Sequence, residues 1–141
     1  MKNELIDLLR NGNHSLVIHR DTTSVYDTRG IATLLQIIDK DSNELSGATV
    51  VDKVVGKAAA ALMVLGKVKA VYAETISEAA LQLFASATDV SVSYHKKVDY
   101  IINRTQTGWC PMELATRDAT TPEECLERIK AKLIELKGNK K

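Results

Sequence analysis

The chain has 141 residues, of which 45% are hydrophobic and 26% are charged, and its formal net charge is +1. This length corresponds to one domain, and the composition is that of a chain that buries a core rather than of a disordered one. Aromatic residues make up only 4%, and the charges nearly balance. A nucleic-acid polymer or an anionic membrane is therefore not an expected partner. We expect a single domain over residues 1–137 and a flexible tail over 138–141.

The cellular environment is inferred from the cysteines and the apolar runs. Cys110 and Cys125 are too few for a disulfide framework or for a zinc site built from cysteine. The first residues are polar and lack the apolar core of a signal peptide, and no apolar run reaches the length of a membrane helix. These features predict a cytoplasmic protein with reduced thiols and no membrane partner.

The first part of the chain is predicted to form a helix, a hairpin and a second helix. A short amphipathic helix carries its apolar residues at 5, 6, 8 and 9 and ends at Asn11–Gly12. Two strands over 15–19 and 24–27 are joined by a short turn, which predicts an antiparallel hairpin. A helix follows from Gly30 to Ile38.

The middle of the chain contains an unusually apolar stretch from Asp52 to Leu65, which predicts a helix that is packed on more than one face. Gly66 is expected to end this helix. A strand over 68–73 and a helix that starts at a capping box, Thr75 to Glu78, are expected next.

A strand over 90–94 and a short one over 100–102 complete the predicted sheet. The last helix has a strong start, with Thr121 as cap, Pro122 in the first turn and Glu124 three residues after the cap. Alternating helices and strands predict an α/β fold with parallel strands, right-handed crossovers and helices on both faces of the sheet. The opening hairpin makes the sheet mixed.

In such a fold, ligands bind beyond the carboxyl ends of parallel strands, near helix amino termini. The first candidate cluster there is Asp52, Lys53 and Lys57. Asp52 is placed as the cap of the predicted helix, and the two lysines, four residues apart, would share one helix face and suit an anion such as phosphate. The alternative is that Asp52 only caps the helix and the lysines only solvate it.

The second candidate cluster follows the predicted strand at 100–102. Cys110, Pro111 and Glu113 repeat the layout of a capping box, with a thiol in place of the usual hydroxyl. A thiolate at a helix amino terminus is stabilised, so Cys110 is a candidate nucleophile or ligand contact. The alternative is a small buried side chain. Asn103 and Arg104 precede it, and Arg104 suits a carboxylate or a phosphate.

Three stretches together resemble the bacterial family called domain of unknown function 1893: residues 45–60, 71–77 and 101–113, with the motifs Asp-Lys-x-x-Gly-Lys and Cys-Pro-Met-Glu. The resemblance covers roughly residues 14 to 115. It implies a cytidine-deaminase-like fold, which is a three-layer α/β/α sandwich around a mixed sheet. It also implies that Asp52 opens the helix that carries the zinc ligand and the catalytic Glu in true deaminases.

The sequence departs from the zinc deaminases at the residues that hold the metal. These enzymes need His-x-Glu or Cys-x-Glu on one helix and Pro-Cys-x-x-Cys at the start of the next. Here the corresponding places hold Asp52-Lys-Val54 and Glu74-Thr-Ile-Ser77. We therefore expect no metal, no cofactor and no zinc-dependent deamination.

The expected function is binding of a small anionic or nucleotide-like molecule in a zinc-free pocket. Lys53, Lys57, Asn103 and Arg104 would bind the ligand. Catalysis, if the chain is an enzyme, would use Cys110 as the thiol and Asp52 or Glu113 as the proton-transfer carboxylate. The alternative function is a non-catalytic regulatory or protein-interaction domain, which would bind through another surface such as a homodimer face.

Overall fold

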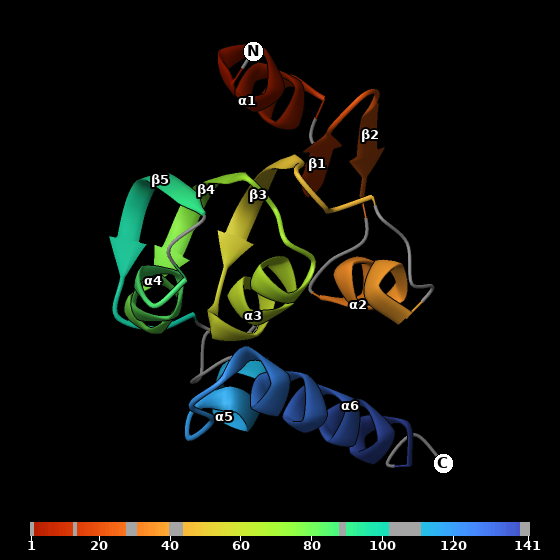
Figure 1. Ribbon diagram of the computed structural model, residues 1–141, viewed down its shortest axis with the longest axis vertical. Helices are drawn as coiled ribbons and strands as arrows, with labels where there is room; N and C mark the ends of the chain where they lie inside the picture. Colours follow the sequence, from red (N-terminus) through yellow and green to blue (C-terminus); the bar gives the residue numbers. More distant parts are fainter. Residues whose placement is uncertain are drawn as a thin grey trace.

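The sheet is the centre of the fold in the computed structural model, which describes residues 2–12, 14–27, 31–39, 44–87, 90–101 and 111–138. Within these residues, five strands form one sheet in the order β2-β1-β3-β4-β5 (Figure 1). The elements are α1 (Lys2–Asn11), β1 (Leu16–His19), β2 (Thr23–Tyr26), α2 (Ala32–Asp39), β3 (Thr49–Val55), α3 (Lys57–Leu65), β4 (Ala70–Ser77), α4 (Glu78–Ala85), β5 (Ser91–Val98), α5 (Pro111–Thr116) and α6 (Pro122–Gly138).

The predicted mixed sheet is confirmed. β1 pairs antiparallel with β2 and with β3, and β3, β4 and β5 pair in parallel. Because β3 pairs with β1 on one side and with β4 on the other, it is the middle strand of the sheet.

Helices cover both faces of this sheet. α1 packs on one face, where a small cluster of buried residues holds it: Leu5, Ile6, Leu9, Val17, Val51 and Tyr72. The main core lies on the other face and joins α2, α3 and α4 to the sheet. These layers fit a three-layer α/β/α sandwich, which confirms the predicted α/β class.

Two further helices, α5 and α6, pack against α3 at the end of the molecule opposite α1 (Figure 1). Cys125 and Ile129 of α6 are completely buried in the main core. α3 therefore has neighbours on several sides, and all residues from Ala58 to Met63 are buried. This confirms the prediction that the apolar stretch is packed on more than one face.

The predicted start of that helix is wrong. Residues 52–55 belong to strand β3, and the helix begins only at Lys57, after Gly56. The sequence Thr49 to Val55 is rich in valine, and β-branched side chains favour strands. Asp52 pairs with Leu16 of β1 and with Ala73 of β4, so it cannot be the cap of α3.

The start of α4 also differs from the prediction. β4 continues to Ser77, and the Ser77 hydroxyl, not that of Thr75, accepts the N–H of Ala80 at 3.1 Å. The last helix is confirmed, because the Thr121 hydroxyl accepts the N–H of Glu124 at 3.1 Å. β5 extends to Val98, beyond the predicted 94, and the residues described in the predicted strand 100–102 are not in a strand.

The central strands are irregular at one level of the sheet. Val51 and Val55 are four residues apart and would share a face in a regular strand. Instead, Val51 packs with α1, whereas Val55 is in the main core; Tyr72 and Ile76 of β4 differ in the same way. The alternation of faces therefore shifts by one residue in both strands, and in β3 the shift lies between Asp52 and Val55.

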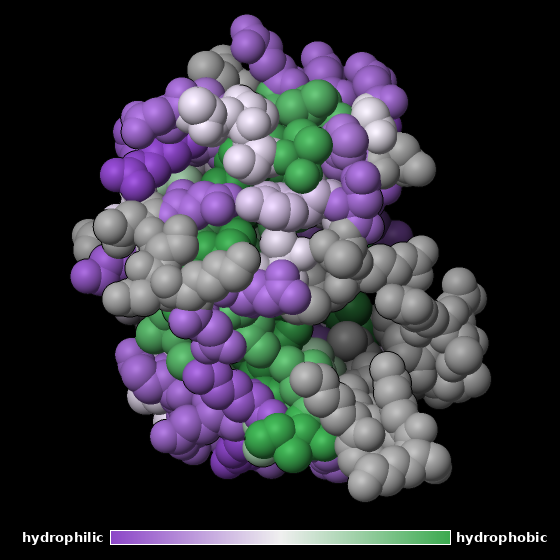
Figure 2. Space-filling model, turned by 90° about the vertical axis from the view of Figure 1, so that its right-hand side faces the viewer, coloured by the Kyte–Doolittle hydropathy of each residue, from purple (hydrophilic) through white to green (hydrophobic). Residues whose placement is uncertain are grey.

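The surface carries no single dominant apolar area on the side shown in Figure 2, where hydrophobic residues form separate patches among hydrophilic ones. The large apolar side chains that are exposed come from different elements, with Leu8 on α1, Val25 on β2 and Ile134 on α6. In the described part of the chain, every helix is too short or too polar to cross a membrane.

Candidate functional site

The amino end of α3 lies at the carboxyl edge of the sheet, where a ligand site was predicted, and a carboxylate of the protein already binds there. Glu113, in α5, is only 3% exposed, and its Oε1 accepts the backbone N–H of Lys57 at 2.5 Å. Gly56 has no side-chain cap of its own. Glu113 therefore caps α3 from another helix, and it does so where the helix dipole favours a negative charge.

Gly56 is what permits this contact. A Cβ atom at this position would overlap Oε1 of Glu113 and would lie 3.0 Å from its Cδ and 3.3 Å from Cγ1 of Ile101. The φ of Gly56 is −98°, an ordinary value for any residue, so the requirement for glycine here is one of space.

The side chain of Lys57 makes a second connection between α3 and the residues that follow α5. Its Nζ donates to the carbonyl oxygens of Ala119 at 2.5 Å and Arg117 at 3.2 Å, both beyond the end of α5. These bonds use a lysine to satisfy carbonyls after a helix carboxyl end, which is favourable. Glu113 and Lys57 thus fix α5 to the start of α3.

Lys53 and Lys57 were predicted to share one helix face, and this is wrong. Lys53 lies in β3, where its backbone N–H donates to the carbonyl of Ser15 at 3.2 Å, and Lys57 is the first residue of α3. The two lysines belong to different elements because the strand extends through Val55.

Asp52 is a carboxyl group in the middle of the sheet. The residues beside it in the register, Leu16 and Ala73, both belong to the main core, so Asp52 projects from that face. Burial raises the pKa of the Asp52 carboxyl from its ordinary 3.8 to about 7, although the backbone N–H groups of Val54 and Lys53 donate to it and lower the pKa.

Three of the predicted site residues, Asn103, Arg104 and Cys110, lie outside the described residues. The described residues on either side of them do carry information. Ile101 and Glu113 both approach Gly56. The described residues that flank the second candidate cluster therefore meet at the amino end of α3, directly after strand β3 ends.

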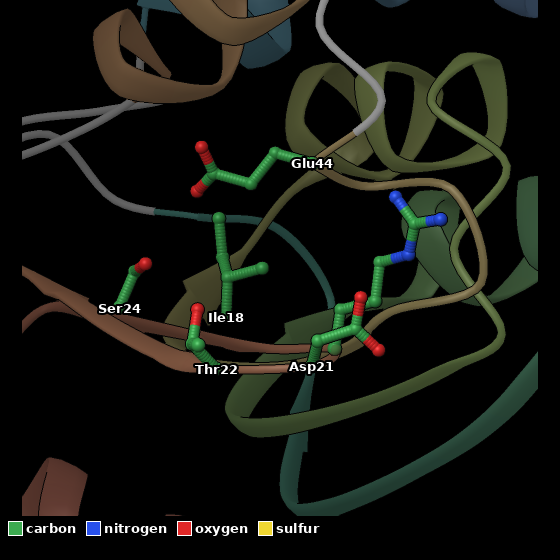
Figure 3. Close-up of a pocket in the computed structure, with 6 residues that line it drawn as sticks. Ile18, Asp21, Thr22, Ser24 and Glu44 are labelled. Atoms are coloured by element: carbon green, nitrogen blue, oxygen red, sulfur yellow. The ribbon is translucent and has the colours of Figure 1, made fainter.

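A hollow that the sequence did not indicate lies beside the β1–β2 hairpin. It measures about 190 Å³ and is lined by Ile18, Arg20, Asp21, Thr22, Ser24 and Glu44. Figure 3 shows Glu44 on one side of this hollow and the hairpin residues on the other. No local pattern relates Glu44 to a turn more than twenty residues earlier, so sequence reasoning had no signal for it.

Tyr26 fixes Glu44 at the border of this hollow. The Tyr26 hydroxyl donates to Oε2 of Glu44 at 2.5 Å, and burial together with this carboxylate raises the pKa of Tyr26 to about 12.

The remaining ionisable groups do not gather into a metal site in the part of the chain that is described, where no three His, Cys, Asp or Glu residues come together. Cys125, the cysteine that is described, is buried, and burial raises the pKa of its thiol. Cys125 is therefore a packing residue of the main core.

Within the described residues, fold and site thus define an α/β domain with a mixed five-stranded sheet and two carboxyl groups, Asp52 inside strand β3 and Glu113 at the start of α3. The chain belongs to the family of domain of unknown function DUF1893, whose model, TM1506, matches residues 4–133.

A solved structure of the same family is similar to the chain over almost its whole length. This is the crystal structure of a DUF1893 family protein, TM1506, from Thermotoga maritima, determined at 2.70 Å resolution. It has a TM-score of 0.83 and 25% sequence identity, and the match covers 93% of this chain and 88% of that one. No curated protein matches the chain.

Proposed function

We propose that this chain binds a small anionic, nucleotide-like molecule at the carboxyl edge of the sheet, where β3 ends and α3 begins. The observation that carries the proposal is the convergence of Ile101 and Glu113 on Gly56. It ties both ends of the segment that contains Asn103 and Arg104 to the edge at which ligands of α/β sheets bind.

The chemistry of the candidate residues suits a ligand with two kinds of group. Arg104 and Lys53 supply positive charge for a phosphate. Asp52 supplies a carboxyl group that can accept hydrogen bonds from the N–H groups of a heterocycle. A nucleotide-like molecule carries both groups, whereas inorganic phosphate carries only the first.

Lys57 and Glu113 have a supporting role in this proposal, which differs from the direct ligand contact and proton transfer predicted from the sequence. Both groups already bind protein atoms, the N–H of Lys57 and the carbonyls of Arg117 and Ala119. They hold α5 against the start of α3.

A cytidine-deaminase-like frame and thiol chemistry are further parts of the proposal. The order of the elements supports the frame, while His-x-Glu and Pro-Cys-x-x-Cys do not occur in the sequence. Cys110 is then the reactive thiol, preceding Pro111 at the start of α5.

The binding site is tested by thermal unfolding with cytidine monophosphate, adenosine monophosphate and inorganic phosphate. A ligand at about 100 times its Kd stabilises the folded state by about 2.7 kcal/mol, which raises Tm by roughly 6–10 °C. Arg104→Ala and Lys53→Ala should reduce this shift. Lys130→Ala is the matched control, because Lys130 is a half-exposed lysine on α6. If all three variants respond alike, or no nucleotide raises Tm, the proposed site is wrong.

The thiol proposal is tested by alkylation with iodoacetamide at neutral pH, followed by peptide mass spectrometry. Cys110 should react faster than a free cysteine. Cys125 serves as the internal control, since its side chain is buried and should react only when the protein unfolds. Alkylation of Cys110 at the rate of free cysteine or slower would remove the nucleophile and leave binding alone.

A non-catalytic interaction domain is the second candidate function. The internal use of Glu113 and Lys57 favours it, because groups that are bound to the protein are not available as ligand contacts. Failure of every nucleotide in the thermal experiment, together with an unreactive Cys110, would favour this candidate.

A further inference from the structure

The outer edge of β5 is the longest edge of the sheet with which none of the described strands pairs. β5 pairs in parallel with β4 from Ser91 to Val98, and none of the described strands pairs with its other side. The opposite edge is formed by β2, which has four residues against eight in β5. A long edge strand offers backbone N–H and C=O groups to an added strand.

This edge is basic along its second half. His95, Lys96 and Lys97 are all exposed, and so is Tyr94, at 44%. Nζ of Lys97 lies 3.1 Å from Oε2 of Glu78 on α4. Consecutive residues of a strand project to opposite faces, so Lys96 and Lys97 would lie on the two sides of any strand that is added here.

A hollow lies at the other end of the same strand. It measures about 220 Å³ and is lined by the first residues of three strands, including Thr49, Tyr72, Ser91 and Ser93. Its lining combines hydroxyl groups with an aromatic ring, so it can hold a small side chain of a strand that runs along β5.

We propose that the outer edge of β5 binds an extended acidic segment of a partner protein, which adds to the sheet as a further strand. Lysines on an edge commonly keep other strands away. Here their charge favours a segment with acidic residues over a neutral or basic one, so the same residues select the partner. A second copy of this chain would bring its own basic β5 and is disfavoured by the same charges.

The test uses two synthetic peptides of about nine residues with blocked ends, one alternating glutamate with valine and the other alternating lysine with valine. Two-dimensional nitrogen–proton NMR spectra of the unmodified protein follow each titration. The glutamate peptide should shift signals of β5 in a saturable way, and the lysine peptide should not. Raising the salt from about 50 to about 500 mM should weaken the binding.

Variants then test the role of charge. Lys96→Gln with Lys97→Gln should weaken binding at least about tenfold. Lys130→Gln with Lys132→Gln removes the same charge from α6 and should have no effect. Equal binding of the two peptides, no binding of the glutamate peptide, or equal affinities of the two double variants would overturn the proposal. Dimerisation of the unmodified chain through β5, detected by NMR and light scattering, would overturn it in favour of a second copy.

Discussion

Glu113 shows how one side chain can stabilise a helix that is remote in the sequence. It belongs to α5 but caps α3, and its carboxylate occupies the space that Gly56 leaves. A buried polar group that loses its hydrogen-bond partner cannot bond to water instead. This contact should therefore contribute more to the free energy of unfolding than an exposed one.

Removing the Glu113 carboxylate should therefore destabilise the protein. Glu113→Ala leaves the N–H of Lys57 without its acceptor and should lower the free energy of unfolding by about 1–3 kcal/mol, measured by urea denaturation. Glu113→Gln keeps an acceptor oxygen and should cost less. Glu127→Ala is an exposed control and should change stability by less than about 0.5 kcal/mol.

The fit between Gly56 and Glu113 can be tested in the same assay. Gly56→Ala should destabilise the wild type, yet cost less when Glu113 is already alanine, giving a coupling of about 0.5–3 kcal/mol in the double-mutant cycle. Strictly additive effects would show that the two residues do not compete for this space.

Asp52 should give stability a distinct pH dependence. Its pKa is raised in the folded state to about 7, so between about pH 4 and pH 7 the folded protein binds a proton that the unfolded chain releases. The free energy of unfolding should fall with rising pH in this window, by at most about 1.4 kcal/mol per pH unit from this group. Asp52→Asn should lose this slope; parallel curves for the two proteins would contradict the assignment.

Among the elements, α4 begins at a different cap residue from the one expected from the sequence, namely Ser77 instead of Thr75. Ser77 is fully buried and its hydroxyl accepts the N–H of Ala80, whereas Thr75 is still in β4. Ser77→Ala should cost about 1 kcal/mol, the usual value for a lost cap. Thr75→Ala removes the hydroxyl that the sequence pattern assigned as the cap and should cost clearly less. Equal losses in urea denaturation would argue against the observed start.

Helix α1 is held to the sheet by a small apolar cluster and by the hydrogen bonds of Arg10. Nε and Nη2 of Arg10 donate to Oε1 and Oε2 of Glu74 at 2.6 and 3.1 Å, and Nη2 also donates to the Tyr72 hydroxyl at 3.2 Å. Because few buried contacts support α1, it should open before the main core.

Arg10→Ala should accelerate hydrogen exchange in α1 while leaving the amides of α3 unchanged. Arg128→Ala, which removes an arginine–glutamate pair within α6, is the control and should not affect α1. If α1 and α3 accelerate together in Arg10→Ala, α1 opens only when the whole protein unfolds.

The whole molecule is organised around α3, which is covered by the sheet on one side and by α5 and α6 on another. Ile129 contributes to this packing from α6 and is fully buried, whereas Ile134 of the same helix is 72% exposed. The last helix is therefore expected to unfold together with the rest of the domain.

Ile129→Ala should lower the free energy of unfolding by about 2–5 kcal/mol and keep a single transition in urea. Ile134→Ala removes the same atoms from the surface and should have almost no effect. A separate early transition in Ile129→Ala, seen by circular dichroism, would show that α6 folds independently.

The features that the sequence predicted correctly depend on local interactions, and those that it missed depend on residues distant in the chain. Local signals were sufficient to predict the hairpin, the Thr121 cap with Pro122 and the burial of α3. Turns, caps and apolar runs are each determined by residues that are neighbours in the sequence. The same signals failed at 52–55, where an apolar run fits a buried strand as well as a helix.

By itself, the sequence determined an α/β domain with a mixed sheet, its approximate element order and the carboxyl edge as the place to look for a ligand. Only the tertiary structure decided that Asp52 lies in β3 between β1 and β4, and that Glu113 caps α3 from another helix. Both outcomes depend on partners that are more than twenty residues away in the chain. A strand is stabilised by the strands beside it, and a buried carboxylate is stabilised by its hydrogen-bond donors. The local sequence pattern identifies neither kind of partner.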